Sequence, residues 1–345
     1  MKLKKKKKII LLCLVTAFIT LEVLLRILYA DKLDVAFRPA VYRSLPVVNY
    51  GYVPDTCFTL SGKNYYINKQ GFIGNDFEEK SVDTFRIAVV GTSVVAGSIN
   101  LREYYSFCPM LQENFTKNNI NVQIINCGID GGDRSLEVLK SINYQIINFN
   151  PDMILMEYVL PFSTWNLIRE NYRGYIIGYP AFDKTGPEYT KQIVDNLHKF
   201  KPYFDVLYHS YVVRSIFSLY TKTSNSHFSW YITLYETKIF VYGNWAPIDF
   251  TLEESADMIH EVKNKLNKLN IQFFLFTPNR DDSLIQTAKK FKLPLISLNT
   301  KFSENDYPPE EGHWNMNGCQ KVADSFYETL TKYDLIPKQY YDRLK

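Results

Sequence analysis

Ser93 and His313 are the residues of this 345-residue chain whose types and surroundings suit chemistry best. Ser93 follows an apolar run, Phe85 to Val90, in the small-residue turn Gly91-Thr92-Ser93. If that run is a strand, the hydroxyl lies at the carboxyl edge of a sheet, where open α/β sheets bind their ligands. The alternative interpretation is an ordinary strand-to-helix loop in which Ser93 is the helix N-cap. A nucleophilic Ser93 needs a base from elsewhere in the chain.

His313 is the candidate base, and it lies in the loop Glu310-Glu311-Gly312-His313-Trp314-Asn315. Serine attack on an acyl carbon needs a base, a group that orients the base, and hydrogen-bond donors for the oxyanion. A carboxylate two or three residues before a histidine can reach Nδ1 and fix the tautomer. Glu310 and Glu311 are therefore both candidates for the orienting acid. The alternative is a histidine at a helix start beside two solvated glutamates.

The oxyanion donors would come from the glycine-containing loop Cys127–Asp133, which follows the apolar stretch 121–126. Glycine has no Cβ, so a backbone N–H there can approach a ligand closely. We expect Gly131 to donate from this loop, together with the N–H of Ser93. The alternative is a loop whose glycines serve only a positive φ.

The elements that would position these residues alternate along the chain as short apolar stretches and amphipathic ones. Strands buried on both faces read as near-continuous apolar runs, and strands that alternate with helices favour a parallel sheet between helical layers. The predicted strands are 85–90, 121–126, 152–158, 271–276 and 294–298. The predicted helices are 101–117, 134–148, 252–269, 281–291 and 315–333.

Two regions depart from this alternation. Residues 31–80 read as an irregular N-terminal collar with short strands, and residues 163–250 form an aromatic-rich insertion. The insertion is interpreted either as a helical subdomain with its own small core or as a lid that stacks on sugar rings. Aromatic side chains suit sugar faces and membrane interfaces alike, so composition leaves both interpretations open. The predicted catalytic domain is residues 81–335, and the insertion 163–250 lies within it.

The N-terminus combines a basic tail, residues 1–8, with an apolar run, residues 9–30. The run is long enough to span a bilayer, and the lysines before it predict a cytoplasmic N-terminus. We expect an uncleaved signal anchor with the rest of the chain outside the cytoplasm, and a cleaved signal peptide is the alternative. Glu22 and Arg26 interrupt the run four residues apart, a spacing that lets them pair on one helix face.

Charge and cysteine content exclude several classes of protein. The net charge of +4 comes from the lysine-rich tail, so the body carries no basic footprint for nucleic acid. Five cysteines without CxxC spacing leave open whether a disulfide or buried free thiols are present. The five histidines form no HExxH or HxH pattern, so we expect neither a metal nor another cofactor.

Four blocks in order resemble the SGNH/GDSL hydrolase superfamily, over about residues 48 to 333. They are Gly91-Thr92-Ser93, Asn126 to Gly131, Pro151-Asp152 to Tyr158, and Glu310 to Asn315. A stretch before the domain, Tyr66 to Phe72, is similar to one in bacterial membrane-anchored members. The resemblance implies a flavodoxin-like three-layer α/β/α sandwich with a parallel sheet.

By position, the resemblance implies Ser93 as the nucleophile and His313 as the base. It implies Gly131 and the Ser93 amide as oxyanion donors, with Glu310 or Glu311 as the acid. Members hydrolyse or transfer acyl esters, and many exported bacterial ones act on acetylated polysaccharides.

The chain departs from the family pattern at three places. Thr92 replaces an aspartate, and a glutamate replaces the usual aspartate before the histidine. Pro161 stands where the family has an asparagine that donates to the oxyanion, and proline has no donor. Loss of one such donor typically lowers the rate about 10²–10³-fold. Ser163 and Asn166 are the nearby candidates to replace it.

The expected function is a membrane-anchored, extracytoplasmic serine esterase. Its substrate would be an ester-bearing small molecule or glycan, with O-acetyl groups of a cell-surface polysaccharide as the expected target. The alternatives are an O-acyltransferase, or a catalytically inactive relative that binds a glycan or a partner.

Overall fold

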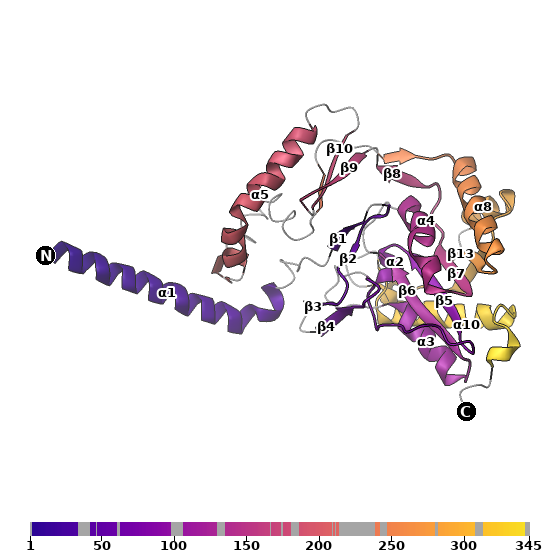
Figure 1. Ribbon diagram of the computed structural model, residues 1–345. Coiled ribbons are helices and arrows are strands. Elements are labelled where there is room, and N and C mark those ends of the chain that lie inside the picture. The colour runs from indigo at the N-terminus through magenta and orange to yellow at the C-terminus, as the bar shows by residue number, and fades with distance from the viewer. Residues whose placement is uncertain are drawn as a thin grey trace. The chain divides into compact units, whose positions relative to one another are not determined.

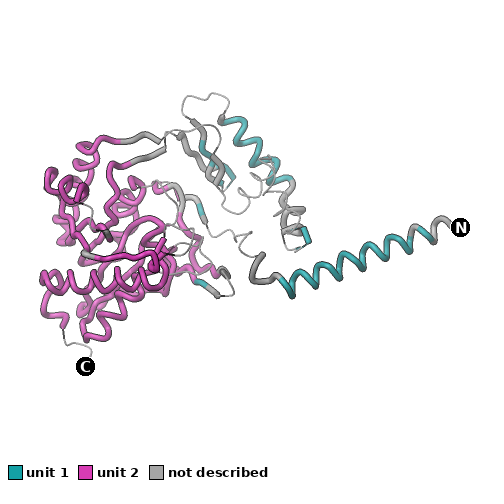
Figure 2. Tube along the Cα trace, turned by 180° about the vertical axis from the view of Figure 1, so that it is seen from behind, with its two compact units in different colours: residues 1–44, 58–65, 168–243 teal, residues 45–57, 66–167, 244–345 magenta. Residues whose placement is uncertain are grey.

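The structure is a computed structural model in which two compact units are distinguished (Figure 2). The first comprises residues 1–44, 58–65 and 168–243, and the second comprises 45–57, 66–167 and 244–345. The residues that the structure describes are 2–33, 42–45, 47–60, 63–97, 106–129, 135–165, 167–173, 175–180, 186–208, 210, 212–213, 239–241, 247–279, 282–307 and 313–341.

The chain begins with one long helix, α1 (Lys2–Leu33) (Figure 1). Its segment Lys8–Leu28 is long and apolar enough to cross a membrane, a property that a signal sequence shares. Short strands follow in the region predicted to be irregular. They are β1 (Tyr42–Leu45), β2 (Asn49–Tyr52), β3 (Thr56–Leu60) and β4 (Lys63–Ile67).

The second unit is built on a five-stranded sheet in the order β14-β13-β7-β5-β6, and all its pairs are parallel. In chain order this is the 2-1-3-4-5 arrangement of flavodoxin-like folds. Every residue of β5 and β7 is buried, which explains why these strands read as continuous apolar runs. The strands are β5 (Phe85–Gly91), β6 (Val122–Gly128), β7 (Met153–Glu157), β13 (Gln272–Asn279) and β14 (Leu295–Thr300).

Helices cover both faces of this sheet. Alternate residues of one strand face opposite sides, so Leu155 packs with α3 and α10, whereas Ile154 packs with α4, α8 and α9. The first pair is α3 (Phe107–Lys117) and α10 (Met316–Lys332). The second set is α4 (Ser135–Tyr144), α8 (Leu252–Lys268) and α9 (Asp282–Lys290). Single 3₁₀ turns occur at Ile146–Phe149, Glu304–Asp306 and Lys338–Tyr340.

This arrangement confirms the predicted α/β/α sandwich with a parallel sheet. The boundaries differ most at α3, which was predicted from residue 101 and begins at Phe107. The Ser106 side chain accepts a hydrogen bond from the Cys108 N–H, and this cap defines the helix start. Residues 101–105 lie outside the described part of the chain.

The stretch before the domain is anchored in the core by Asn68 and Phe72. Asn68 is buried; its Oδ1 accepts from the Phe72 N–H at 2.9 Å, and its Nδ2 donates to the Asn75 carbonyl at 3.0 Å. The turn directs Phe72 into the core, where its ring meets Phe149 edge-on at 5.9 Å. The segment thus packs as part of the second unit.

The aromatic-rich insertion contains strands as well as a helix, so the helical interpretation is incomplete. Its strands are β8 (Ser163–Trp165), β9 (Leu167–Tyr172), β10 (Tyr175–Pro180), β11 (Ile239–Val241) and β12 (Pro247–Asp249). Helix α5 (Gly186–Tyr208) packs on β10 through a small core that includes Ile177 and Leu197. Aromatic and β-branched residues, which are frequent in this region, favour strands. Much of the rest of the insertion lies outside the described residues.

All five cysteines are free, which answers the question that spacing left open. Cys108, Cys127 and Cys319 are buried in the core. Burial raises the pKa of Cys108 and of Cys319 to about 12 and raises that of Cys127 well above its ordinary range. These thiols act as small apolar side chains rather than as nucleophiles.

Candidate active site

Three neighbouring strands end together where the strand order reverses. From β5 the chain adds β6 on one side and later β7 on the other, so the reversal lies between β5 and β7. Gly91 at the end of β5 is in register with Gly128 at the end of β6, and Val90 is in register with Met156 of β7. Ligands of open α/β sheets bind at such a switch point, outside the carboxyl ends of the strands.

Ser93 stands directly beyond this edge, as the first residue of the short helix α2 (Ser93–Ala96). Thr92, not Ser93, is the N-cap residue, so the interpretation of Ser93 as a cap is wrong. The Thr92 carbonyl accepts from the N–H groups of Val95 at 3.0 Å and Ala96 at 2.9 Å. The turn is therefore closed by its own backbone, and the partly exposed Ser93 side chain is available to other groups.

The structure brings His313 to Ser93 across 220 residues of sequence. The distance between His313 Nε2 and Ser93 Oγ is 2.9 Å, which is hydrogen-bond distance and suits a nucleophile with its base. Both side chains are partly exposed, so a substrate can reach them. A donor hydroxyl and an acceptor Nε2 would leave the ring proton on Nδ1.

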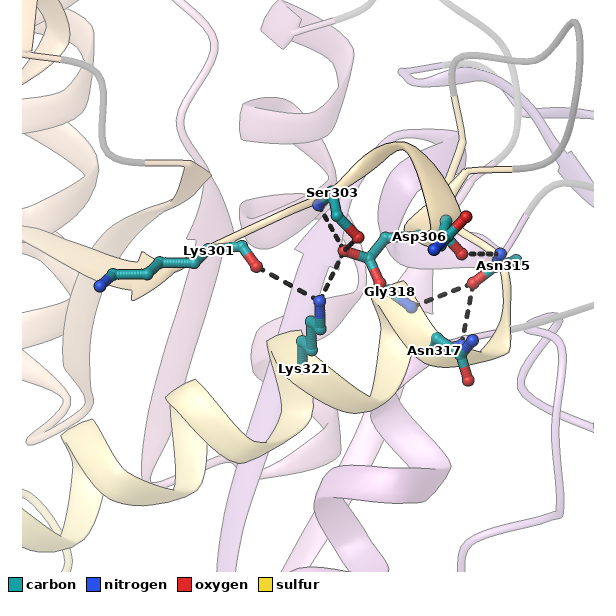
Figure 3. Close-up of polar contacts among 8 residues, drawn as sticks. Lys301, Ser303, Asp306, Asn315, Asn317, Gly318 and Lys321 are labelled. Atoms are coloured by element: carbon teal, nitrogen blue, oxygen red, sulfur yellow. Dashed lines mark hydrogen bonds and ion pairs between the residues drawn. The ribbon is translucent and has the colours of Figure 1, made fainter.

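The position of His313 is set by the N-cap of α10, which lies two residues further on. Asn315 is the N-cap: its Oδ1 accepts from the N–H groups of Asn317 at 2.9 Å and Gly318 at 3.1 Å (Figure 3). The Asn315 N–H donates to the Asp306 carbonyl at 2.9 Å. The histidine thus lies on a segment fastened to α10 on one side and to the 304–306 turn on the other.

Asp306 is a buried carboxylate that holds this turn together. Its Oδ2 accepts from the Ser303 N–H at 2.6 Å, from the Ser303 hydroxyl at 3.0 Å and from Lys321 Nζ at 2.7 Å (Figure 3). The hydrogen bond from Lys321 and those from Ser303 lower the pKa of Asp306, because each of them stabilises its charged form. Asp306 is ionised at neutral pH and serves the loop rather than the reaction.

Trp314, next to the histidine, is packed among aromatic rings. It stacks on Phe302 with ring centroids 5.4 Å apart and planes 8° apart, and it meets Phe107 of α3 edge-on at 6.3 Å. Such contacts hold the neighbouring backbone in one conformation. The segment that carries His313 is therefore packed into the core on the α3 and α10 side of the sheet.

Glu157 is a site-lining residue that the sequence reasoning did not single out. It ends the central strand β7, is buried, and its Oε2 accepts from the Thr92 N–H at 2.7 Å and from the Thr92 hydroxyl at 2.9 Å. Burial raises the pKa of Glu157, and the two hydrogen bonds from Thr92 oppose part of that rise. A carboxylate directly after the apolar run 153–156 of the predicted strand was the available signal.

Two glycines let the strand ends approach the serine turn. A Cβ on Gly128 would lie 2.6 Å from the Ala96 Cα, and one on Gly91 would lie 2.7 Å from Glu157 Oε2. Both are closer than real Cβ atoms come, so any other residue would push the turn away. The small residues around Ser93 are thus required by packing.

Most of the other predicted site residues lie outside the described part of the chain. Gly131, Glu310, Glu311 and Asn166 lie outside the described residues, so their roles remain predictions. Pro161 is described, follows β7 and is exposed. Within the described ranges, no group of three or more His, Cys, Asp or Glu side chains could hold a metal ion.

Comparisons with known proteins return structures of low similarity. No protein family model and no curated protein matches the chain. Similar solved structures are GDSL-type lipases and esterases. The psychrotrophic esterase EstA from Pseudoalteromonas sp. is 12% identical, with 73% of this chain and 99% of that one covered and a TM-score of 0.39.

A GDSL-like lipase from Bacteroides thetaiotaomicron is 10% identical, with 74% and 93% covered and a TM-score of 0.36. A family 3 carbohydrate esterase from Clostridium thermocellum is 12% identical, with 72% and 96% covered and a TM-score of 0.35.

Proposed function

We propose that this protein is a serine esterase that forms an acyl-enzyme on Ser93. The observation that carries the proposal is the 2.9 Å separation of Ser93 Oγ and His313 Nε2 at the switch point of the sheet. Ser93 follows the end of β5 and His313 precedes α10, and each of these segments is fixed by hydrogen bonds of its own. A hydroxyl and an imidazole held in this way form the nucleophile–base unit of acyl transfer.

The reaction would proceed in two steps, acylation and deacylation of Ser93. Ser93 Oγ attacks the acyl carbon while its proton passes to His313 Nε2, and the same proton then goes to the departing alcohol oxygen. Water or a sugar hydroxyl next attacks the acyl-enzyme and gives its proton to Nε2. Nε2 returns that proton to Ser93 Oγ as the acid or new ester departs, which restores the free hydroxyl. We assign the oxyanion to the N–H groups of Ser93 and Gly131, and the orientation of His313 to Glu310 or Glu311.

The N–H of Ser93 suits the oxyanion role because of its place in the turn. It is the first N–H of α2, and the first N–H groups of a helix have no partner within the helix. The turn is held by the Val95, Ala96 and Thr92 N–H groups instead. A donor so placed requires no rearrangement when negative charge develops on the substrate.

We further propose that the enzyme is anchored by Lys8–Leu28 with its N-terminus in the cytoplasm and the catalytic unit outside. The lysine block before that span supports this orientation. The proposed substrates are ester groups of an exported glycan, O-acetyl groups above all. Aromatic residues are frequent in 163–250, and their rings suit sugar faces as well as membrane interfaces.

Covalent labelling tests the catalytic proposal. The full-length protein in detergent is treated with a fluorophosphonate probe and assayed with p-nitrophenyl acetate. We expect labelling and turnover that Ser93→Ala abolishes. The matched control Ser81→Ala alters a serine whose hydroxyl only accepts from the Asp83 N–H in a surface turn, and it should behave as wild type. Turnover that persists in Ser93→Ala would refute the proposal.

Pro161 supports a second candidate function, a glycan-binding protein without turnover. It removes a donor that the resemblance places at the oxyanion, and a missing donor lowers the rate about 10²–10³-fold. This candidate predicts that acetylated glycan is bound equally by the wild type and by Ser93→Ala, with no hydrolysis by either. Calorimetric titration with an acetylated oligosaccharide, together with the esterase assay, separates the two functions.

A further inference from the structure

Glu22 lies well inside the apolar part of α1, where a carboxylate is unfavourable. It precedes Leu28, the end of the candidate span, by six residues, or about 9 Å along the helix axis. Arg26 is long and half-exposed and lies nearer to that end, so it can extend toward water. The glutamate side chain is too short to do so and needs partners at its own depth.

The structure provides these partners. Glu22 Oε1 accepts from Arg26 Nε at 2.9 Å and pairs with its Nη2 at 2.9 Å. Glu22 Oε2 accepts from the Ser210 hydroxyl and from the Val212 N–H, each at 2.9 Å. Both carboxylate oxygens are thus satisfied, and two of the donors come from a segment 188 and 190 residues away in the sequence.

Burial along the helix points to the same contact independently. Within the described part of α1 whose side chains are placed, Glu22 and Leu25 alone are partly buried, while the others are exposed. Residues three apart share one helix face. Glu22 retains 15% of its side-chain exposure, against 52% for Arg26 on the next turn. One face of the outer end of α1 is therefore covered by the chain itself.

The covering segment is suited to that position. Val212 is buried, and the Ser210 hydroxyl also accepts from the Val213 N–H at 3.4 Å. The Ser210 hydroxyl and the N–H groups of Val212 and Val213 all take part in hydrogen bonds. Backbone at membrane depth is tolerated only where its polar groups are satisfied by protein.

We propose that Ser210, Val212 and Val213 dock on the anchor helix through Glu22, at the level of the outer leaflet, so that a second part of the chain is held at the membrane. This inference rests on the proposed membrane anchor. The partner of the Glu22 face is thus an inserted segment of the same chain, belonging to the unit that carries α1.

Thiol cross-linking of the full-length protein in membranes tests this docking. The background carries Cys13→Ser and Cys57→Ser, which removes the two exposed thiols, and a protease site at Val82, a loop residue that is 90% exposed. Leu25→Cys with Val213→Cys, which leaves the Glu22 carboxylate and the Ser210 hydroxyl in place, should be joined by a short bifunctional thiol reagent. After the protease cuts at position 82, the two linked fragments should stay together. When the reagent contains a reducible bond, a reductant should separate them.

The matched control pair is Val15→Cys with Val213→Cys, which also leaves Glu22 and Ser210 unchanged. Val15 lies two turns before Glu22 on the same face, about 10.5 Å away along the axis, and is exposed. We expect the control fragments to separate. Equal linkage of both pairs, or linkage of neither, would overturn the docking.

A further variant removes the carboxylate from the linked pair. Glu22→Leu is added to Leu25→Cys with Val213→Cys. Leucine suits lipid better than glutamate does, so a merely hydrophobic contact would persist, whereas docking through the carboxylate predicts loss of the link. Persistence of the link with Glu22→Leu would overturn the role of Glu22.

Alkaline carbonate extraction of the same membranes separates this inference from the proposed anchor. Retention of the protein together with the specific link supports both. A specific link in a protein that carbonate removes would overturn the placement at the membrane, and retention without a link would overturn the docking alone.

Discussion

Replacing Glu157 tests whether a buried carboxylate holds the serine turn in place. Glu157→Leu fills a similar volume but removes the acceptor for the N–H and the hydroxyl of Thr92. Glu157→Gln keeps one amide oxygen that can accept from both groups and removes the charge. The pair of variants separates hydrogen bonding from charge at one position.

The expected magnitude follows from the two hydrogen bonds. Leaving the Thr92 N–H without an acceptor costs about 1–3 kcal/mol, and losing the hydroxyl bond costs about 1 kcal/mol more. We therefore expect Glu157→Leu to be about 2–4 kcal/mol less stable than Glu157→Gln. Thr92→Val, which removes the hydroxyl bond alone, should lower the unfolding free energy by about 1 kcal/mol.

The pH dependence of the unfolding free energy tests the raised pKa of Glu157 separately. Burial raises the pKa of Glu157, so the folded protein binds more protons than the unfolded chain between the unfolded pKa of about 4.3 and the raised folded pKa. The unfolding free energy contributed by this group therefore falls as the pH rises through that window. Glu157→Gln lacks a titrating group and should lose this part of the pH dependence.

Urea denaturation and hydrogen exchange at the Thr92 amide measure these effects, and fluorophosphonate labelling reports the geometry of Ser93. We expect faster amide exchange and slower labelling for Glu157→Leu, and near-wild-type values for Glu157→Gln at neutral pH. If Glu157→Leu matched Glu157→Gln in stability, exchange and labelling, the positioning role of Glu157 would be refuted.

Three further substitutions test the supports of the site. Asp306→Asn weakens the contact with Lys321. Because its pKa is lowered in the folded protein, Asp306 stabilises the wild type at pH values above its unfolded pKa of about 3.9. In acid denaturation the wild type should lose this stabilisation as the pH falls, whereas the variant lacks it at every pH. Gly128→Ala places a Cβ against the Ala96 backbone, so it should destabilise the protein by about 1–3 kcal/mol and slow labelling of Ser93; unchanged melting would contradict this. Thr251→Ala removes the capping box of α8 and should lower the unfolding free energy by about 1 kcal/mol with labelling unchanged.

The sheet was predictable because its strands are buried on both faces. Strands β5 and β7 have no exposed face, so their sequences carry a continuous apolar signal whose ends lie within two residues of the predicted ones. Helix α3 was predicted to start too early, because its start depends on a single side chain, the Ser106 cap, rather than on apolar periodicity. Local hydrogen bonds decide such boundaries.

The site was predictable only in part, because its residues meet through the strand order. Ser93 and His313 stood out by residue type and local sequence, and the structure places their side chains at hydrogen-bond distance. The pairing of Glu157 with Thr92 depends on β7 lying beside β5, a neighbour relation that no local pattern encodes. The sequence reasoning also missed Asp306, because its partner Lys321 lies in α10, 15 residues further along the chain, and the two meet only through the fold.

The measurement that tests the central claim most directly is the site of covalent modification by a fluorophosphonate. Peptide mass spectrometry of the labelled full-length protein should find the adduct on Ser93. The rate of its formation should fall sharply in His313→Gln, which removes the base, and no adduct should form in Ser93→Ala. An adduct on another residue, or labelling of Ser93 that is indifferent to His313→Gln, would contradict the assignment of these residues as nucleophile and base.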